Sequence, residues 1–126
     1  MNMINKYFIE SVGRCRKILE PHKKKAYKTQ HRVGYVYLIK DRDLYKIGMS
    51  ENPNIRARQF NGNLVLTIPT YDMIKTESAI HEAFNDKRVY GEWFNLSDDD
   101  ISLIVSIKKV LWYLGMLMMT TLNVQR

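Results

Sequence analysis

The chain has 126 residues, of which 45% are hydrophobic, and a formal net charge of +7. This length suits one domain with a real core, and a single cysteine excludes an internal disulfide and any cysteine-based zinc cluster. The longest apolar run, residues 110–119, is shorter than the ~20 residues of a membrane-spanning helix, and residues 1–20 lack the apolar core of a signal peptide. We therefore expect a cytoplasmic, intracellular protein with no membrane partner.

The positive charge is concentrated in the N-terminal quarter. Residues 1–34 carry nine basic side chains against two glutamates, whereas residues 35–126 carry eleven of each sign. A basic arm of this kind favours nucleic acid, because neutralised phosphates release counterions. The alternative is a solvated tail that keeps the protein soluble. The side chains that we expect to contact nucleic acid are Lys23, Lys24, Lys25, Lys28, Arg32 and Arg58.

The basic arm is expected to form one helix and a linker. Apolar residues at helical spacing predict an amphipathic helix over residues 3–19, which ends near Pro21 and is followed by a lysine-rich segment. We accordingly divide the chain into a basic N-terminal region, residues 1–32, and a domain over residues 33–126 whose core is residues 33–96.

A hairpin and a capped helix follow the linker. Alternating apolar residues predict strands over residues 33–40 and 44–49, joined by a short charged turn. Asn52 then offers an N-cap and Pro53 a favourable first helical residue, so a helix should run through about Phe60.

The second half of the domain should contain one more full strand and two helices. We predict a strand over residues 64–70, a helix over residues 74–87, at most a stub of strand at residues 92–94, and a last helix capped by Ser97. The expected fold is therefore α/β (α+β), a small three-stranded antiparallel sheet flanked by helices.

The hairpin carries polar side chains where a purely structural strand would carry valine and isoleucine. By the period of two, Tyr35 and Tyr37 share one face of the first strand, and Lys46 and Gly48 share one face of the second. A hairpin that closes at Arg42 would bring Tyr37 and Lys46 together on one side of the sheet.

These residues resemble the GIY-YIG nucleases. The family's first motif, Gly-Ile-Tyr followed by one residue and an aliphatic, looks like residues 35–39, and its second, Tyr-Ile-Gly-x-Ser, looks like residues 46–50. Its catalytic arginine lies eight residues after that glycine, at the position of Arg56, and its metal-binding glutamate is similar to Glu77. The resemblance covers roughly residues 33–96.

Two positions depart from the family pattern. Tyr35 stands at the glycine of the first motif, with Gly34 displaced by one, and Lys46 stands at the tyrosine of the second, with Tyr45 displaced by one. The Lys-Ile-Gly form, with the later Glu-x-x-x-His and Gly-Glu-Trp-Phe, resembles a phage- and virus-associated branch of the superfamily. For a protein of viral or phage origin, the resemblance therefore implies a location inside the host cell.

The resemblance implies a metal-dependent DNA endonuclease, with RNA as the alternative substrate. Tyr37 would accept or relay a proton from water, Lys46 would orient that water or offset the phenolate charge, and Arg56 would grip the scissile phosphate. Glu77 would hold Mg²⁺, or another divalent cation such as Mn²⁺. A single carboxylate in the motif set favours one metal ion.

Further candidate site residues are Tyr35, His81 and Asn95. His81 lies one helical turn after Glu77, so it could be a second metal ligand, a phosphate contact, or a supporting residue behind the site. Asn95 resembles a late polar residue of some family members.

Each site residue also has a purely structural interpretation. Tyr37 would then be an ordinary strand tyrosine, Lys46 an edge residue with its head in water, and Arg56 a surface charge. Glu77 is harder to explain in this way, because it shares the face of Ile80 that enters the core, where an unpaired carboxylate is costly.

Two other classes of protein compete with the enzyme. One is a catalytically inactive nucleic-acid-binding module on the same scaffold, since Lys46 replaces the family's tyrosine. The other is a membrane-surface protein that uses the basic arm and the apolar C-terminal helix. We also predict a homodimer through the methionine-rich end of that helix.

Overall fold

The computed structural model describes residues 10–19 and 32–124, and the side chains as far as residue 114. Residues 10–19 are helical. The other helices are α2 (Pro53–Phe60), α3 (Met73–Ala83) and α4 (Asp98–Val124), and the strands are β1 (Gly34–Asp41), β2 (Leu44–Ser50), β3 (Asn63–Thr70), β4 (Arg88–Tyr90) and β5 (Trp93–Phe94).

The α+β class is confirmed, but the sheet has five strands and not the three expected. Their order is β3-β1-β2-β5-β4, and each neighbouring pair is antiparallel. The two added strands have three and two residues. Strands so short give no period-two pattern in the sequence. β5 is stabilised by pairing with β2, and β4 by pairing with β5.

The expected helix over residues 74–87 is also shorter in the structure. The α-helix ends at Ala83, and a 3-10 turn over Asn85–Lys87 leads directly into β4. Of the N-terminal helix predicted over residues 3–19, residues 10–19 are described, while residues 3–9 and the lysine-rich linker lie outside the described part.

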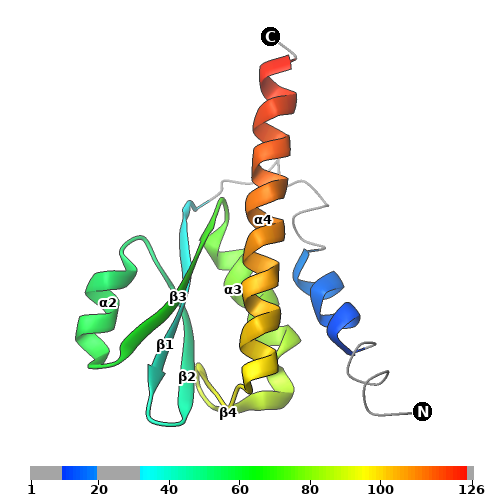
Figure 1. Ribbon diagram of the computed structural model, residues 1–126. Helices are drawn as coiled ribbons and strands as arrows, with labels where there is room; N and C mark the ends of the chain where they lie inside the picture. The colour runs from blue at the N-terminus through cyan, green and yellow to red at the C-terminus, as the bar shows by residue number, and fades with distance from the viewer. Residues whose placement is uncertain (1–9, 20–31, 125–126) are drawn as a thin grey trace.

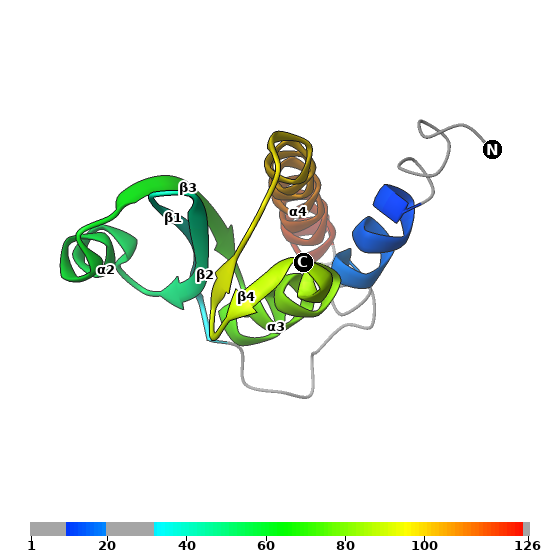
Figure 2. The ribbon, with the colours of Figure 1, turned by 90° about the horizontal axis from the view of Figure 1, so that it is seen from below.

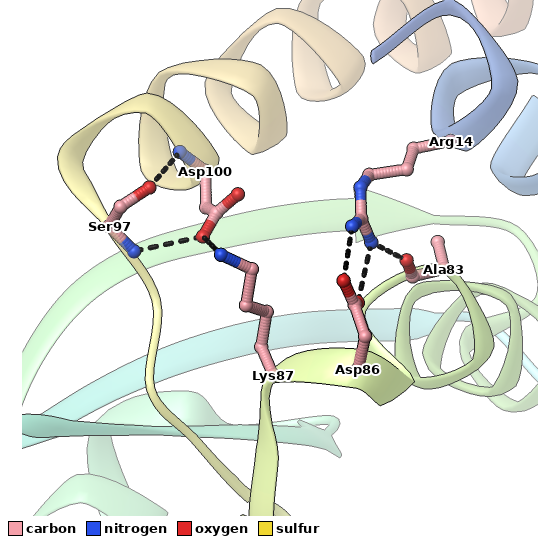
Figure 3. Close-up of polar contacts among 6 residues, drawn as sticks. All are labelled: Arg14, Ala83, Asp86, Lys87, Ser97 and Asp100. Atoms are coloured by element: carbon pink, nitrogen blue, oxygen red, sulfur yellow. Dashed lines mark hydrogen bonds and ion pairs between the residues drawn. The ribbon is translucent and has the colours of Figure 1, made fainter. Parts of the chain in front are cut away.

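The predicted N-caps are confirmed. The Asn52 side chain accepts a hydrogen bond from the backbone N–H of Ile55, with Pro53 in the first turn. Ser97 and Asp100 cap each other reciprocally, since the Ser97 hydroxyl accepts from the Asp100 N–H at 3.1 Å and the Asp100 carboxylate accepts from the Ser97 N–H at 2.9 Å (Figure 3). These caps satisfy helix N–H groups that would otherwise be unpaired.

The sheet separates two layers of helices. In two perpendicular views, α2 lies on one side of the sheet, and α3 and α4 lie on the other with the N-terminal helix outside them (Figures 1 and 2). The larger core fills the α3 and α4 side, and α2 covers a much smaller core. The larger core includes Ile18, Val36, Leu38, Ile47, Ile68, Ile80, Phe84, Phe94, Ile104 and Ile107, and the smaller one consists of Tyr37, Ile39 and Ala57 with Phe60 and Leu64 at its margin.

The N-terminal helix is fastened to the end of α3 by one arginine. The Arg14 guanidinium donates to both carboxylate oxygens of Asp86, at 2.9 and 2.6 Å, and also to the Ala83 carbonyl (Figure 3). Ile18 of the same helix is fully buried in the larger core. The described part of the basic arm is therefore packed on the domain.

Among the described residues, none of the helices combines the length and the apolar character that crossing a membrane would require.

Candidate active site

Tyr37 lies across Gly48 on the side of the sheet that α2 covers. The two residues are direct partners in the hairpin, and a Cβ atom added to Gly48 would stand 2.3 Å from the Tyr37 hydroxyl oxygen. The ring is 1% exposed and packs with Ile39 and Ala57. The absence of a side chain at Gly48 is therefore what allows the phenol to lie against the second strand.

Lys46 occupies the same side of the hairpin, diagonally from Tyr37. It pairs with Ile39 in the register, one step of two residues from the Tyr37 and Gly48 pair. The side chain is nearly buried, and its ammonium lies 2.8 Å from a carboxylate oxygen of Glu92 and 4.5 Å from the centre of the Phe60 ring. The prediction that Tyr37 and Lys46 share one face is confirmed.

The structure also shows which residues stand at the two motif positions that differ from the family pattern. Tyr45 belongs to the larger core on the opposite side of the sheet, so Lys46 alone stands at the position of the second motif's tyrosine. Gly34 packs against Met73, where an added Cβ would lie 2.4 Å from the sulfur. Tyr35 is on the Tyr37 side and is 37% exposed.

Arg56 reaches the same neighbourhood from α2. Its side chain is exposed, donates to Gln59 at 3.0 Å, and lies with its guanidinium carbon 5.2 Å from the centre of the Phe60 ring. The Lys46 ammonium contacts that same ring. Phe60 therefore stands between two cationic groups, one nearly buried and one open to solvent.

Glu77 approaches the site from α3 and is half-buried. Its pKa is raised to about 7, first by burial and second by the nearby charge of Glu92, while the charge of Lys46 acts in the opposite direction. No salt bridge joins Glu77 to a basic side chain within the described part of the chain. A carboxylate so placed gains free energy from a bound cation.

His81 is held by the backbone of β2. Its Nε2 lies 2.7 Å from the Ile47 carbonyl oxygen, which can only accept, so Nε2 carries the proton. Burial lowers the pKa of the ring, and the imidazole packs against Phe94 with the ring centres 5.2 Å apart. Because Nε2 is occupied in this way, the arrangement matches the supporting role for His81 better than ligation through that nitrogen.

The remaining predicted residues are not gathered at this site. Asn95 is exposed, and its backbone N–H donates to the Lys87 carbonyl at 2.8 Å. Arg32 and Arg58 are exposed, with Arg32 3.8 Å from Glu51. The predicted contacts Lys23, Lys24, Lys25 and Lys28 lie outside the described residues.

The acidic side chains suit a cation held mainly by water and phosphate. In residues 10–19 and 32–114, no three or more His, Cys, Asp and Glu side chains converge into a metal-binding group. Magnesium commonly uses only one or two carboxylates and keeps several waters or substrate oxygens. Glu77 therefore fits as a single protein ligand, and it does not fit a two-metal site.

Sequence reasoning did not identify Glu92 as part of the site. Glu92 is 46 positions from Lys46 along the chain, and it arrives through the β4–β5 turn, which the sequence signals only weakly. One signal was available, because a lysine at the centre of a hairpin face needs a counter-charge once it is buried.

Together these residues define a class of protein: a small α+β domain with a phenol, an ammonium, a guanidinium and a half-buried carboxylate around one hairpin. The T5orf172 domain family matches residues 34–109, more than half of the chain, and the chain belongs to this family. That domain is GIY-YIG-like, phage-associated and related to endonucleases, and it indicates a nuclease-like or DNA-binding function. No curated protein and no solved structure matches the chain.

Proposed function

We propose that the protein is a metal-dependent DNA endonuclease of the GIY-YIG type, in the branch that carries Lys-Ile-Gly in its second motif. The observation that carries this proposal is Glu77. It is a half-buried carboxylate without a salt-bridge partner in the described residues, and its pKa of about 7 reports the cost of its charge. It approaches Lys46, which shares one hairpin face with the Tyr37 phenol.

The residues divide the work of phosphodiester hydrolysis. Tyr37 accepts or relays the proton that water loses as it attacks phosphorus, and the Lys46 ammonium offsets the negative charge that then develops on the phenol. Arg56, exposed on α2, binds the scissile phosphate through its forked guanidinium. A divalent cation on Glu77, Mg²⁺ or Mn²⁺, would supply charge neutralisation at the phosphate and the leaving oxygen.

The test is incubation with supercoiled plasmid, with and without Mg²⁺. Wild-type protein should nick or cut the plasmid only with the cation, and Arg56→Ala and Glu77→Ala should each lose at least about 10²-fold in rate. Glu82→Ala is the matched control, because Glu82 is an exposed carboxylate on the same helix as Glu77. If a folded Glu77→Ala or Arg56→Ala variant cuts at the native rate, the site assignment is wrong.

The nucleic-acid contact is proposed for the basic arm and is tested separately from chemistry. Changing Lys23, Lys24, Lys25 and Lys28 to glutamine should flatten the salt dependence of DNA affinity, each lost phosphate contact reducing the slope of log K against log salt by roughly 0.9. An unchanged slope would show that this lysine cluster is a solvated tail. RNA of the same sequence serves as the competing ligand.

The second candidate is a binding module that does not cleave. The observation in its favour is that the Lys46 ammonium stands where the family has a phenol, and it is already paired with Glu92 at 2.8 Å. Wild-type protein that binds DNA but leaves it intact with Mg²⁺ and Mn²⁺ would support this function over the first. The homodimer through α4 is a further proposal, which sedimentation of the full chain would test.

A further inference from the structure

Lys46 is in an unusual setting for a lysine. Its side chain is 9% exposed, although an ammonium removed from water loses several kcal/mol of solvation unless it is paired. Aromatic rings take up part of this cost, since the ammonium lies 4.5 Å from the Phe60 ring centre and 5.8 Å from that of Trp93. Within the described residues, its one salt bridge is to Glu92.

The backbone of Glu92 is fixed to β2 by a hydrogen bond that does not involve its side chain. Its carbonyl accepts a hydrogen bond from the Ile47 N–H at 3.0 Å, directly beside Lys46 in β2. The preceding Gly91 has a φ of 52°, in the left-handed region, which lets the chain turn between β4 and β5. The turn therefore carries the Glu92 carboxylate to the Lys46 ammonium, at 2.8 Å.

We propose that Glu92 is a positioning residue of the active site, which holds the Lys46 ammonium on the Tyr37 side of the hairpin. This inference rests on the proposed nuclease function. Lys46 in the second motif and Glu92 in the β4–β5 turn then act as one unit that replaces the single tyrosine of the more usual motif. A tyrosine there would need no counter-charge, whereas a lysine without Glu92 would turn its ammonium toward water.

The proposal gives Glu92 a role different from that of Glu77. The Glu92 carboxylate already accepts from an ammonium and its side chain is 42% exposed, whereas Glu77 is half-buried without a salt bridge in the described residues. Glu92 therefore acts through Lys46, and removing its charge should slow the reaction while cleavage still depends on the cation at Glu77.

The experiment compares Glu92→Gln with Glu82→Gln in the full chain, so that both variants lose one negative charge. Glu92→Gln should lower kcat about ten-fold or more, with DNA affinity and the Mg²⁺ requirement equal to those of Glu82→Gln. In ¹⁵N-labelled protein, the Lys46 ammonium should give an NMR signal protected from exchange with water, and Glu92→Gln alone should remove it. Circular dichroism melting checks that both variants fold.

Testing Glu92→Gln in a second variant, Lys46→Tyr, shows whether Glu92 acts through Lys46 or independently of it. In Lys46→Tyr there is no ammonium to hold, so adding Glu92→Gln should change kcat by less than about two-fold. An equal loss in both backgrounds would overturn the proposal and would favour Glu92 as a cation ligand. Retained cleavage in Glu92→Gln, or an unchanged Lys46 signal, would also overturn it, whereas wild-type protein that cuts nothing would instead refute the proposed function.

Discussion

The two sides of the sheet differ in the side chains that they bury. The side that faces α3 and α4 holds the larger apolar core, with fully buried residues from the N-terminal helix, the sheet and both of these helices, and α3 adds the half-buried Glu77 at its margin. The side under α2 has three buried residues in its core, one of them Tyr37, and admits the nearly buried Lys46. Most of the buried apolar area therefore lies on one face and the proposed Tyr37 and Lys46 pair on the other, so a substitution in the larger core away from Glu77 should leave the proposed site largely intact.

The largest effect is expected from a cavity in the α3 and α4 side. Ile104 of α4 is fully buried, so Ile104→Ala should lower the free energy of unfolding by about 2–5 kcal/mol. Cleavage per folded molecule, assayed well below the melting temperature, should be unchanged. Urea unfolding and plasmid nicking are measured on the same sample. A loss of cleavage per folded molecule that parallels the loss of stability would show that the two faces do not act independently.

A single hydroxyl should matter on one side of the sheet and not on the other. Tyr37→Phe keeps the packing of a ring that is 1% exposed, but should cost about 10²-fold in cleavage rate. Tyr45→Phe is the matched control on the opposite side, and its cleavage rate should stay within about two-fold of the wild-type rate. Single-turnover cleavage of the two variants makes this comparison. Full activity in Tyr37→Phe would remove the phenol from the mechanism.

Glu77 links the site to stability through pH. Its pKa is raised from 4.5 to about 7, so the folded chain binds this proton more tightly than the unfolded chain does. The contribution of protonated Glu77 to the free energy of unfolding is therefore fully present below pH 4.5 and is lost as pH rises through 7. The loss should be about 1–2 kcal/mol after allowance for solvent screening.

Unfolding at pH 5 and pH 8 measures this loss, and Glu77→Gln is the reference that removes it. Saturating Mg²⁺ should restore stability at pH 8 in wild type only, and should shift the acid limb of the cleavage profile to lower pH. Equal pH dependence in wild type and Glu77→Gln would contradict the assignment.

The smallest effect is expected where the N-terminal helix meets α3. The Arg14 side chain is 16% exposed and that of Asp86 58%, so Asp86→Asn should cost only about 0.5–1 kcal/mol. High salt should reduce the difference, and cleavage should not change. Thermal melts at two ionic strengths make the measurement, and a large loss of activity would mean that the basic arm enters the site.

Local signals in the sequence were enough for most of the fold. Asn52, Pro53 and Ser97 marked the helix starts, and alternation in the hairpin placed Tyr37 and Lys46 on one side. These features depend on neighbours a few positions away, which periodicity and capping rules capture.

Features that depend on distant partners could not be predicted in the same way. β5 pairs with β2 and β4 pairs with β5, and Glu92 enters the site from the turn between these two short strands. The bond from Arg14 to Asp86 joins residues 72 positions apart. Such contacts are set by how whole elements pack, so single-sequence rules recover the hairpin of the site and miss Glu92 and the short strands that carry it.

A substitution at Gly48 should disturb the proposed site without removing any of its functional groups. A methyl group there would stand 2.3 Å from the Tyr37 hydroxyl oxygen and 2.5 Å from the ring carbon that bears it, and the rigid, 1% exposed ring has little room to move. Gly48→Ala would therefore displace the phenol while every charged side chain that attracts nucleic acid stays. Under the proposed function, such a variant should bind DNA without cutting it and would suit a structure of the complex.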